Sequence, residues 1–364
     1  WGFTLSDGFD VNDSNGVGPV LRRDGAGALL RSEEFSNDQR SGGHALRMNY
    51  ASPFLGGLID LTARYGVNDY ENLTLQTSPT VRRESRYQEE GSSGEFGAVF
   101  TRPLGSRLTS ETRFIHEFSD NNGVSLSRTT LSGVGSPEQG FASDSKASET
   151  ILRSLVRFEQ SANLTWESGG EVAYNMLETD QAFSVGGIPV PLPSASVKVE
   201  ETRGELFGKG AWRIRDNFSV ESGLRLEGST ISQSGDAESE KTFTFIKPRL
   251  LATWTPGAAN QFRVRFEREV GQLDFNAFAA SAELQNENVL GGNIDLEPEQ
   301  RWISELAYER RFWGDGDVSV TLRHDEITDA IDVIPLEEGL SVTGNIGDGT
   351  LDRLAVYVQA PLGR

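Results

Sequence analysis

The chain of 364 residues contains no cysteine, which excludes disulfide bonds and every zinc or iron–sulfur site built on thiolates. Its three histidines, His44, His116 and His324, lie far apart in the sequence, which argues against a histidine-rich metal site. Acidic residues outnumber basic residues by 54 to 34, so the chain lacks the basic surface that a nucleic-acid partner requires. We therefore expect no cofactor and no nucleic-acid partner.

Long hydrophobic runs are also missing. No apolar stretch approaches the roughly 18 residues that a membrane-spanning helix needs, and the mean hydropathy is -0.41. Neither absence excludes a membrane, because the strands of a transmembrane barrel alternate lipid-facing and lumen-facing residues and keep the average hydropathy low.

The ends of the chain lack the marks of a complete polypeptide. The segment that begins at Trp1 has no initiating methionine, no basic region and no apolar region of a signal peptide. The last five residues, 360–364, are typical of a turn. We therefore expect a piece of a longer polypeptide.

Alternation with a period of two is the strongest pattern that is present. Between Gln261 and Val270, apolar residues such as Phe262 and Phe266 fall on one face, with Arg268 as the exception, while Arg263 and its alternate neighbours fall on the other. A helix has a period of 3.6 and would not sort the residues in this way. Similar alternation recurs near residues 59–65, 164–176, 218–227, 246–254, 301–312 and 318–323.

The connections between these segments alternate between short and long. Short turns rich in Gly, Pro, Asn and Asp lie near residues 52–56, 103–106, 160–162, 215–217, 256–259 and 314–316. Between them we expect long polar loops at 12–42, 67–91, 119–146, 179–197, 229–241, 272–297 and 335–346. An up-and-down meander with every long loop on one side gives this order, and bacterial outer-membrane barrels have it.

Aromatic residues gather next to the short turns and predict a girdle at one membrane interface. They are Tyr50, Phe100, Phe158, Trp212, Trp254, Phe262, Phe312 and Trp313. The opposite faces carry many charges, which would be costly to bury unpaired in a dry core. The pattern predicts an all-β, antiparallel, up-and-down transmembrane barrel with apolar residues outward and a polar lumen. We expect roughly 13 or 14 strands of a barrel of about 22, forming one domain over residues 1–364, of which 1–42 are the least readable.

Several motifs in residues 200–364 resemble those of TonB-dependent outer-membrane receptors. Residues 270–275 (VGQLDF), the segment 292–300 (GNIDLEPEQ) and residues 345–349 (NIGDG) match the family's elements in order and spacing. The resemblance implies a barrel whose plug domain, TonB box and final strands are absent from this sequence. It also implies structural roles for Gly271, Gln272, Asp274, Phe275, Asn293, Leu296, Pro298, Glu299, Asn345 and Gly347.

The same resemblance implies uptake of a scarce solute, for example an iron–siderophore complex, rather than enzymatic activity. The implied partners are outer-membrane lipid and lipopolysaccharide, the TonB complex acting through the missing plug, and a small solute such as a metal chelate. A passive porin or structural barrel, and a secreted β-rich binding module, are the alternatives. Candidate ligand contacts are Phe183, Ile188, Val190, Phe275 and Phe278.

Overall fold

The computed structural model describes residues 2–192, 194–284, 288–335 and 340–361. Its described part is dominated by fourteen long strands in one antiparallel sheet, which matches the number expected from the sequence. The long strands are β1 (Gly2–Arg23), β2 (Leu29–Phe54), β3 (Gly57–Thr77), β4 (Val81–Pro103), β5 (Leu108–Leu131), β7 (Gln139–Ser161), β8 (Leu164–Val185), β10 (Ser196–Arg215), β11 (Phe218–Gly235), β12 (Ser239–Trp254), β13 (Asn260–Val270), β16 (Gln300–Phe312), β17 (Gly316–Pro335) and β18 (Leu340–Gln359).

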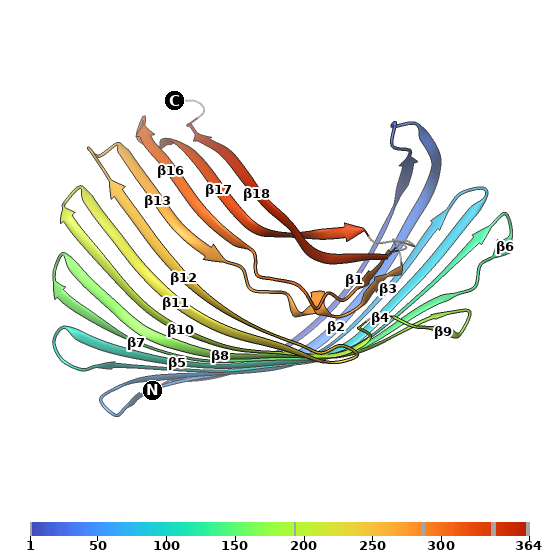
Figure 1. The fold of residues 1–364 in the computed structure, drawn as a ribbon, viewed down its shortest axis with the longest axis horizontal. Helices are drawn as coiled ribbons and strands as arrows, with labels where there is room; N and C mark the ends of the chain where they lie inside the picture. The colour runs from blue at the N-terminus through green and yellow to red at the C-terminus, as the bar shows by residue number, and fades with distance from the viewer. Residues whose placement is uncertain (1, 193, 285–287, 336–339, 362–364) are drawn as a thin grey trace.

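Each long strand pairs with the next one along the chain, so the sheet is an up-and-down meander. Figure 1 shows it as one strongly curved wall that is open between β1 and β18. The shorter elements are β6 (Val134–Gly135), β9 (Ile188–Val190), β14 (Ser281–Glu283), β15 (Asn288–Gly291) and the 3-10 helix η1 (Phe275–Phe278). The expectation of an all-β, antiparallel, barrel-type sheet is confirmed. Among the described residues, no helix is both long and apolar enough to cross a membrane.

The six short turns expected from the sequence all lie at one end of the strands, which we call the turn end. The first described residue and the last strand residue also lie there, because Gly2 pairs with Ala51 and Gln359 pairs with Asp317. In Figure 1 the turn end is on the left and the opposite, far end is on the right.

Most of the predicted long loops are wrong, because the strands continue through them to the far end. In place of a loop at 12–42, β1 pairs with β2 as far as Arg23, and Asp24 closes the turn by accepting hydrogen bonds from the backbone of Ala26 and Ala28. Ladder pairing also runs through most of 67–91, 119–146, 179–197 and 229–241. Both faces of these strand ends are polar, so the sequence loses its alternation although the backbone ladder persists. Only 272–297 is largely irregular; of the loop predicted at 335–346, residues 336–339 lie outside the described part and the rest is strand.

The two faces of the sheet differ as the alternation predicts. On one face, which we call outer, Val264 and Phe266 are 49% and 44% exposed. On the other face, which we call inner, Glu267 is only 7% exposed. Cross-strand pairing continues the apolar outer surface onto both neighbours of β13. Phe266 pairs with Leu250 of β12, and Val264 pairs with Leu306 of β16. A charged inner face and an exposed apolar outer face are the reverse of a soluble sandwich.

The outer apolar band is bounded by aromatic residues at one edge and by polar residues at the other. An aromatic row marks its lower edge near the turn end, where the Trp254 and Phe262 rings are 5.5 Å apart and the Phe262 and Tyr308 rings 4.7 Å apart. From Trp254 to Ile246 the band extends eight residues along β12, or about 26 Å at the usual rise of a strand. Beyond it the outer face becomes polar: Glu200 accepts a hydrogen bond from Tyr174 and pairs with Lys198.

Arg268 breaks the alternation and lies at the upper edge of this band. Its guanidinium lies 5.7 Å from the centre of the Trp302 ring and donates to the carbonyl oxygen of Ile246 at 3.2 Å. An arginine can occupy this level because its stem is apolar and its charged group reaches toward water.

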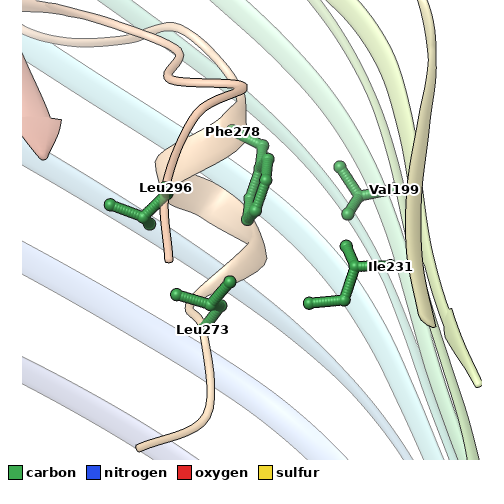
Figure 2. Packing of buried hydrophobic residues seen from close by; sticks show 5 residues of the cluster. All are labelled: Val199, Ile231, Leu273, Phe278 and Leu296. Atoms are coloured by element: carbon green, nitrogen blue, oxygen red, sulfur yellow. The ribbon is translucent and has the colours of Figure 1, made fainter. Parts of the chain in front are cut away.

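The described residues of 271–299, which we call the inner segment, fold onto the inner face instead of extending the β13–β16 hairpin. Figure 2 shows Leu273, Phe278 and Leu296 of this segment facing Val199 of β10 and Ile231 of β11. All five residues are buried. They form the one hydrophobic core cluster identified in the described residues, and this cluster holds the segment against an otherwise polar wall.

Candidate functional site: the inner face and its cavities

Two asparagines fasten the inner segment to β17 and β18. Asn293 donates its amide to the Thr343 carbonyl at 2.9 Å, and its own carbonyl oxygen accepts from the Asp295 backbone at 2.9 Å. Asn345 accepts from the Glu297 backbone and donates to the Glu297 carbonyl, both at 2.9 Å. Backbone pairing of β15 with the start of β18 adds a third, parallel connection.

Glu299 and Gly347 lie at the same junction. Glu299 accepts from the Ile331 backbone at 3.2 Å and from the Arg301 side chain at 2.5 Å, and Pro298 beside it is buried. Gly347 adopts a φ of +102° where the register between β17 and β18 shifts, a conformation that favours glycine. The structure thus gathers these motif residues around the re-entry of the inner segment into the sheet.

The start of the inner segment contains the other motif residues. The Gly271 backbone donates to the Glu299 carbonyl at 2.8 Å, which closes the base of the segment. Asp274 caps η1 by accepting from the Asn276 backbone at 2.9 Å. Gln272 and Phe275 line a cavity described below, whereas Leu296 belongs to the hydrophobic cluster.

The five candidate ligand contacts occupy different places. Phe278 packs in the cluster, and Phe275 lies beside it with ring centres 6.4 Å apart. Phe183, Ile188 and Val190 lie on the β8–β9 hairpin, in which Phe183 pairs with Val190. Ile188 at the tip is exposed. The structure therefore does not bring the five residues together, and their contact with a ligand stays a prediction.

A ladder of ion pairs crosses the inner face from β7 to β17. Around Glu267, Arg249 approaches to 3.2 Å and Arg265 forms a closer pair. Further along, the carboxylate of Asp325 is fully buried and accepts two hydrogen bonds of 2.7 Å from Arg323. Other members of the ladder are Arg157–Glu167–Lys209, Arg153–Glu171–Arg203 and Arg225–Glu205–Lys247–Glu227. This wall contains an ionic cavity of about 390 Å³.

A row of carboxylates crosses β4, β5 and β7 on the same face. Glu95 lies directly opposite Glu117, and Glu117 directly opposite Glu149, so like charges are cross-strand neighbours. With Glu201 of β10 and Phe275 of the inner segment they line an acidic cavity of about 470 Å³. Like charges in this arrangement destabilise a sheet and create a negative potential that attracts cations.

A third, neutral cavity of about 640 Å³ lies nearer the far end. Its wall consists mainly of hydroxyl and amide side chains from β3, β4, β5, β7 and β8, together with the aromatic residues Tyr70, Tyr87 and Phe141. The Tyr70 and Tyr87 rings lie 6.0 Å apart. Burial and a hydrogen bond to the Glu89 carboxylate raise the pKa of the Tyr87 phenol above its usual range, so the phenol stays neutral.

Most residues of the neutral cavity are missed by the sequence motifs, because they belong to stretches interpreted as loops. The carboxylates of the acidic cavity lie outside those stretches but belong to no motif. Over the described ranges, no group of three or more His, Asp or Glu side chains is arranged to hold a metal ion.

Comparison with known proteins gives one family match. Residues 2–352 match the model of the family described as TonB dependent receptor-like, beta-barrel. A search of curated proteins finds no match to the chain.

Solved structures share the fold at low sequence identity. The copper transporter OprC is similar with a TM-score of 0.62 and 11% identity over 98% of this chain and 58% of its own. The ferric-catecholate import receptor Fiu from E. coli K12 has a TM-score of 0.56 at 7% identity, covering 96% of this chain and 62% of its own. The siderophore receptor PiuA from Acinetobacter baumannii has a TM-score of 0.55 at 10% identity, covering 98% and 61%. The chain therefore spans about three fifths of the length of these structures.

Proposed function

Because the chain belongs to the TonB-dependent receptor-like β-barrel family, we propose that it forms barrel wall of a transporter that takes up a scarce solute across the bacterial outer membrane, driven by the TonB complex. Receptors of this kind are transporters and not enzymes. A metal chelate is the first candidate solute, because the structural neighbours include one described as a ferric-catecholate import receptor and one described as a siderophore receptor.

One observation carries the proposal: the sheet has an exposed apolar outer face and an ionic inner face. Val264 and Phe266 would contact lipid, and Glu267 and Asp325 would face a polar interior. Lipopolysaccharide would contact the polar outer surface beyond the apolar band. A secreted binding module would expose far less apolar surface, since large apolar patches on soluble proteins promote association.

We propose that the full-length protein carries a plug domain that fills the space bounded by the inner face and performs the energised step. The inner segment, held by Asn293 and Asn345, would then lie between solute and plug. Basic side chains of such a plug would neutralise the carboxylate row of Glu95, Glu117 and Glu149.

Deletion of the full-length gene, compared with deletion of the gene for TonB in the same strain, tests this function. Growth is measured on defined iron sources and defined carbon sources, each as the limiting nutrient. We expect both deletions to abolish growth on the same single source. If only the receptor deletion has this effect, the barrel is a passive porin; if neither does, transport of a scarce solute is contradicted.

A further inference from the structure

The neutral cavity differs in charge from the rest of the inner face. Among its lining residues Glu89 is the charged side chain on the inner face, because Arg86 alternates with Ser85 and Tyr87 and its side chain lies on the outer face. On that outer face Arg86 approaches Glu71 to 3.9 Å, whereas in the cavity Glu89 accepts a hydrogen bond from the Tyr87 hydroxyl. By contrast, the ionic cavity is lined on the inner face by four cations and three carboxylates: Arg225, Lys247, Arg249, Arg301, Glu267, Glu269 and Glu299.

The neutrality extends across neighbouring strands in register. Asn121 of β5 lies opposite Ser145 of β7, which lies opposite Thr179 of β8. In the adjacent row, Ser143 lies opposite Gln181. Side chains two residues apart share a face, so these rows form one continuous hydrogen-bonding surface. The chain as a whole has a net charge of -20, so a surface made mainly of uncharged polar side chains is unusual within it.

The wall also holds hydrogen-bonding capacity that it does not use internally. Asn72 Oδ1 and Gln181 Oε1 are buried, and within the described part they accept no hydrogen bond. Buried polar atoms usually have a partner, so unpaired amide oxygens beside a cavity are candidates for pairing with donors of a bound molecule. The faces of Tyr70, Tyr87 and Phe141 supply apolar area next to these groups.

From these features we propose that the neutral cavity binds the solute of this transporter, and that the solute is uncharged and rich in hydroxyl or amide groups. The inference rests on the proposed function and specifies its substrate class. An anionic chelate entering this cavity would lose hydration without gaining a cation, since the charged side chain that lines it on the inner face is the carboxylate of Glu89. A neutral iron tris-hydroxamate and a neutral oligosaccharide share the required chemistry.

Binding to the full-length protein in detergent distinguishes these sources from each other and from an anionic chelate. The probes are ferrichrome as the neutral hydroxamate, a set of neutral oligosaccharides that includes maltoheptaose and cellohexaose, and ferric enterobactin as the anionic catecholate. We expect one of the two neutral classes to bind, and ferric enterobactin to bind about 100-fold more weakly.

Two pairs of variants locate the site. Ser143→Lys adds a cation to the neutral wall, and Ala142→Lys adds the same cation one residue away on the outer face, where Ala142 is exposed. We expect Ser143→Lys alone to tighten the binding of ferric enterobactin by about tenfold. Tyr87→Ala should weaken the neutral probe by about tenfold, whereas Tyr65→Ala, which removes an exposed outer-face ring, should not.

The outcomes separate this inference from the proposed function. Ferric enterobactin binding as tightly as either neutral class, or no binding of any neutral probe by the folded protein, overturns the substrate class. In either case the TonB dependence of growth still decides the transport function independently. A neutral probe that binds equally well to wild type and Tyr87→Ala also overturns the assignment, because it places the solute elsewhere.

Discussion

Asn345 and Glu297 exchange two hydrogen bonds of 2.9 Å although 48 residues separate them. The side-chain amide of Asn345 thus makes the two hydrogen bonds that a neighbouring strand would make, at a point of the inner segment that has no strand partner. The same amide donates to the Asp329 carbonyl at 2.8 Å, so one side chain connects the inner segment to the irregular part of the β17–β18 pair.

Replacing Asn345 should release the inner segment without unfolding the sheet. Asn345→Ala removes three hydrogen bonds to the backbone of Glu297 and Asp329, each contributing about 0.5–1.5 kcal/mol. We expect faster hydrogen exchange across residues 271–299 and unchanged exchange in β3 and β4. Asn49→Ala on β2 is the control. Equal exchange rates in wild type and Asn345→Ala would show that the asparagine does not hold the segment.

Gly292 allows the inner segment to pass close to η1. A Cβ at this position would lie 2.1 Å from the Phe278 carbonyl oxygen, so Gly292→Ala must displace the helix from its cluster. We expect a lower melting temperature and increased proteolysis within 271–299. Gly228→Ala is the matched control, because a Cβ there meets nothing within 4 Å. Identical melting of the two variants would contradict the close approach.

The buried carboxylate of Asp325 should be the most sensitive member of the ion-pair ladder. Asp325→Ala leaves Arg323 without its bidentate partner and Arg301 without an anion at 3.7 Å. We expect a loss of about 3–5 kcal/mol in the free energy of unfolding, measured in urea in lipid or detergent. Glu309→Ala, which removes a pair of 3.6 Å with the exposed Arg311, should lose only about 0–1 kcal/mol. A small effect at Asp325 would mean that water reaches this site freely.

In the carboxylate row, removing a charge should raise the free energy of unfolding instead of lowering it. Glu117 lies between Glu95 and Glu149, so Glu117→Gln removes two like-charge contacts and should stabilise the isolated barrel by about 0.2–1 kcal/mol. The gain should shrink as salt is added, because exposed charges are screened. A loss of stability at low salt would contradict the prediction, because it would show that Glu117 has a favourable partner within the barrel itself.

The alternation of β13 and β16 could be read from the sequence because each strand has one apolar and one charged face. The motif around Asn293, Glu299 and Asn345 could be located as well, because these residue types recur in order and at fixed spacing. The far halves of the strands could not be recognised. There both faces are polar, as in Asn121 and Ser143 on the inner face and Asp144 on the outer, so only the backbone ladder defines the strand.

The same physical reason hid the neutral cavity. Tyr70 and Tyr87 contact each other only through the pairing of β3 with β4, and nothing in the local sequence marks them as neighbours. The burial of Phe278 in the cluster likewise depends on Val199 and Ile231, which lie more than forty residues earlier in the sequence. Pairing register, which the sequence encodes only indirectly, decides these contacts.

Because the chain has no cysteine, single cysteines can be placed without background and used to test the membrane orientation directly. Spin labels at positions 262 to 267 of the full-length protein in lipid vesicles would be compared for collision with oxygen, which concentrates in lipid, and with a water-soluble nickel chelate. We predict that oxygen access is high at the positions of Phe262, Val264 and Phe266 and low at positions 263, 265 and 267, because only the first three face lipid. Equal access of the nickel chelate to Phe266 and to the arginine-bearing positions, or oxygen access that peaks at Glu267, would contradict a lipid-facing outer surface.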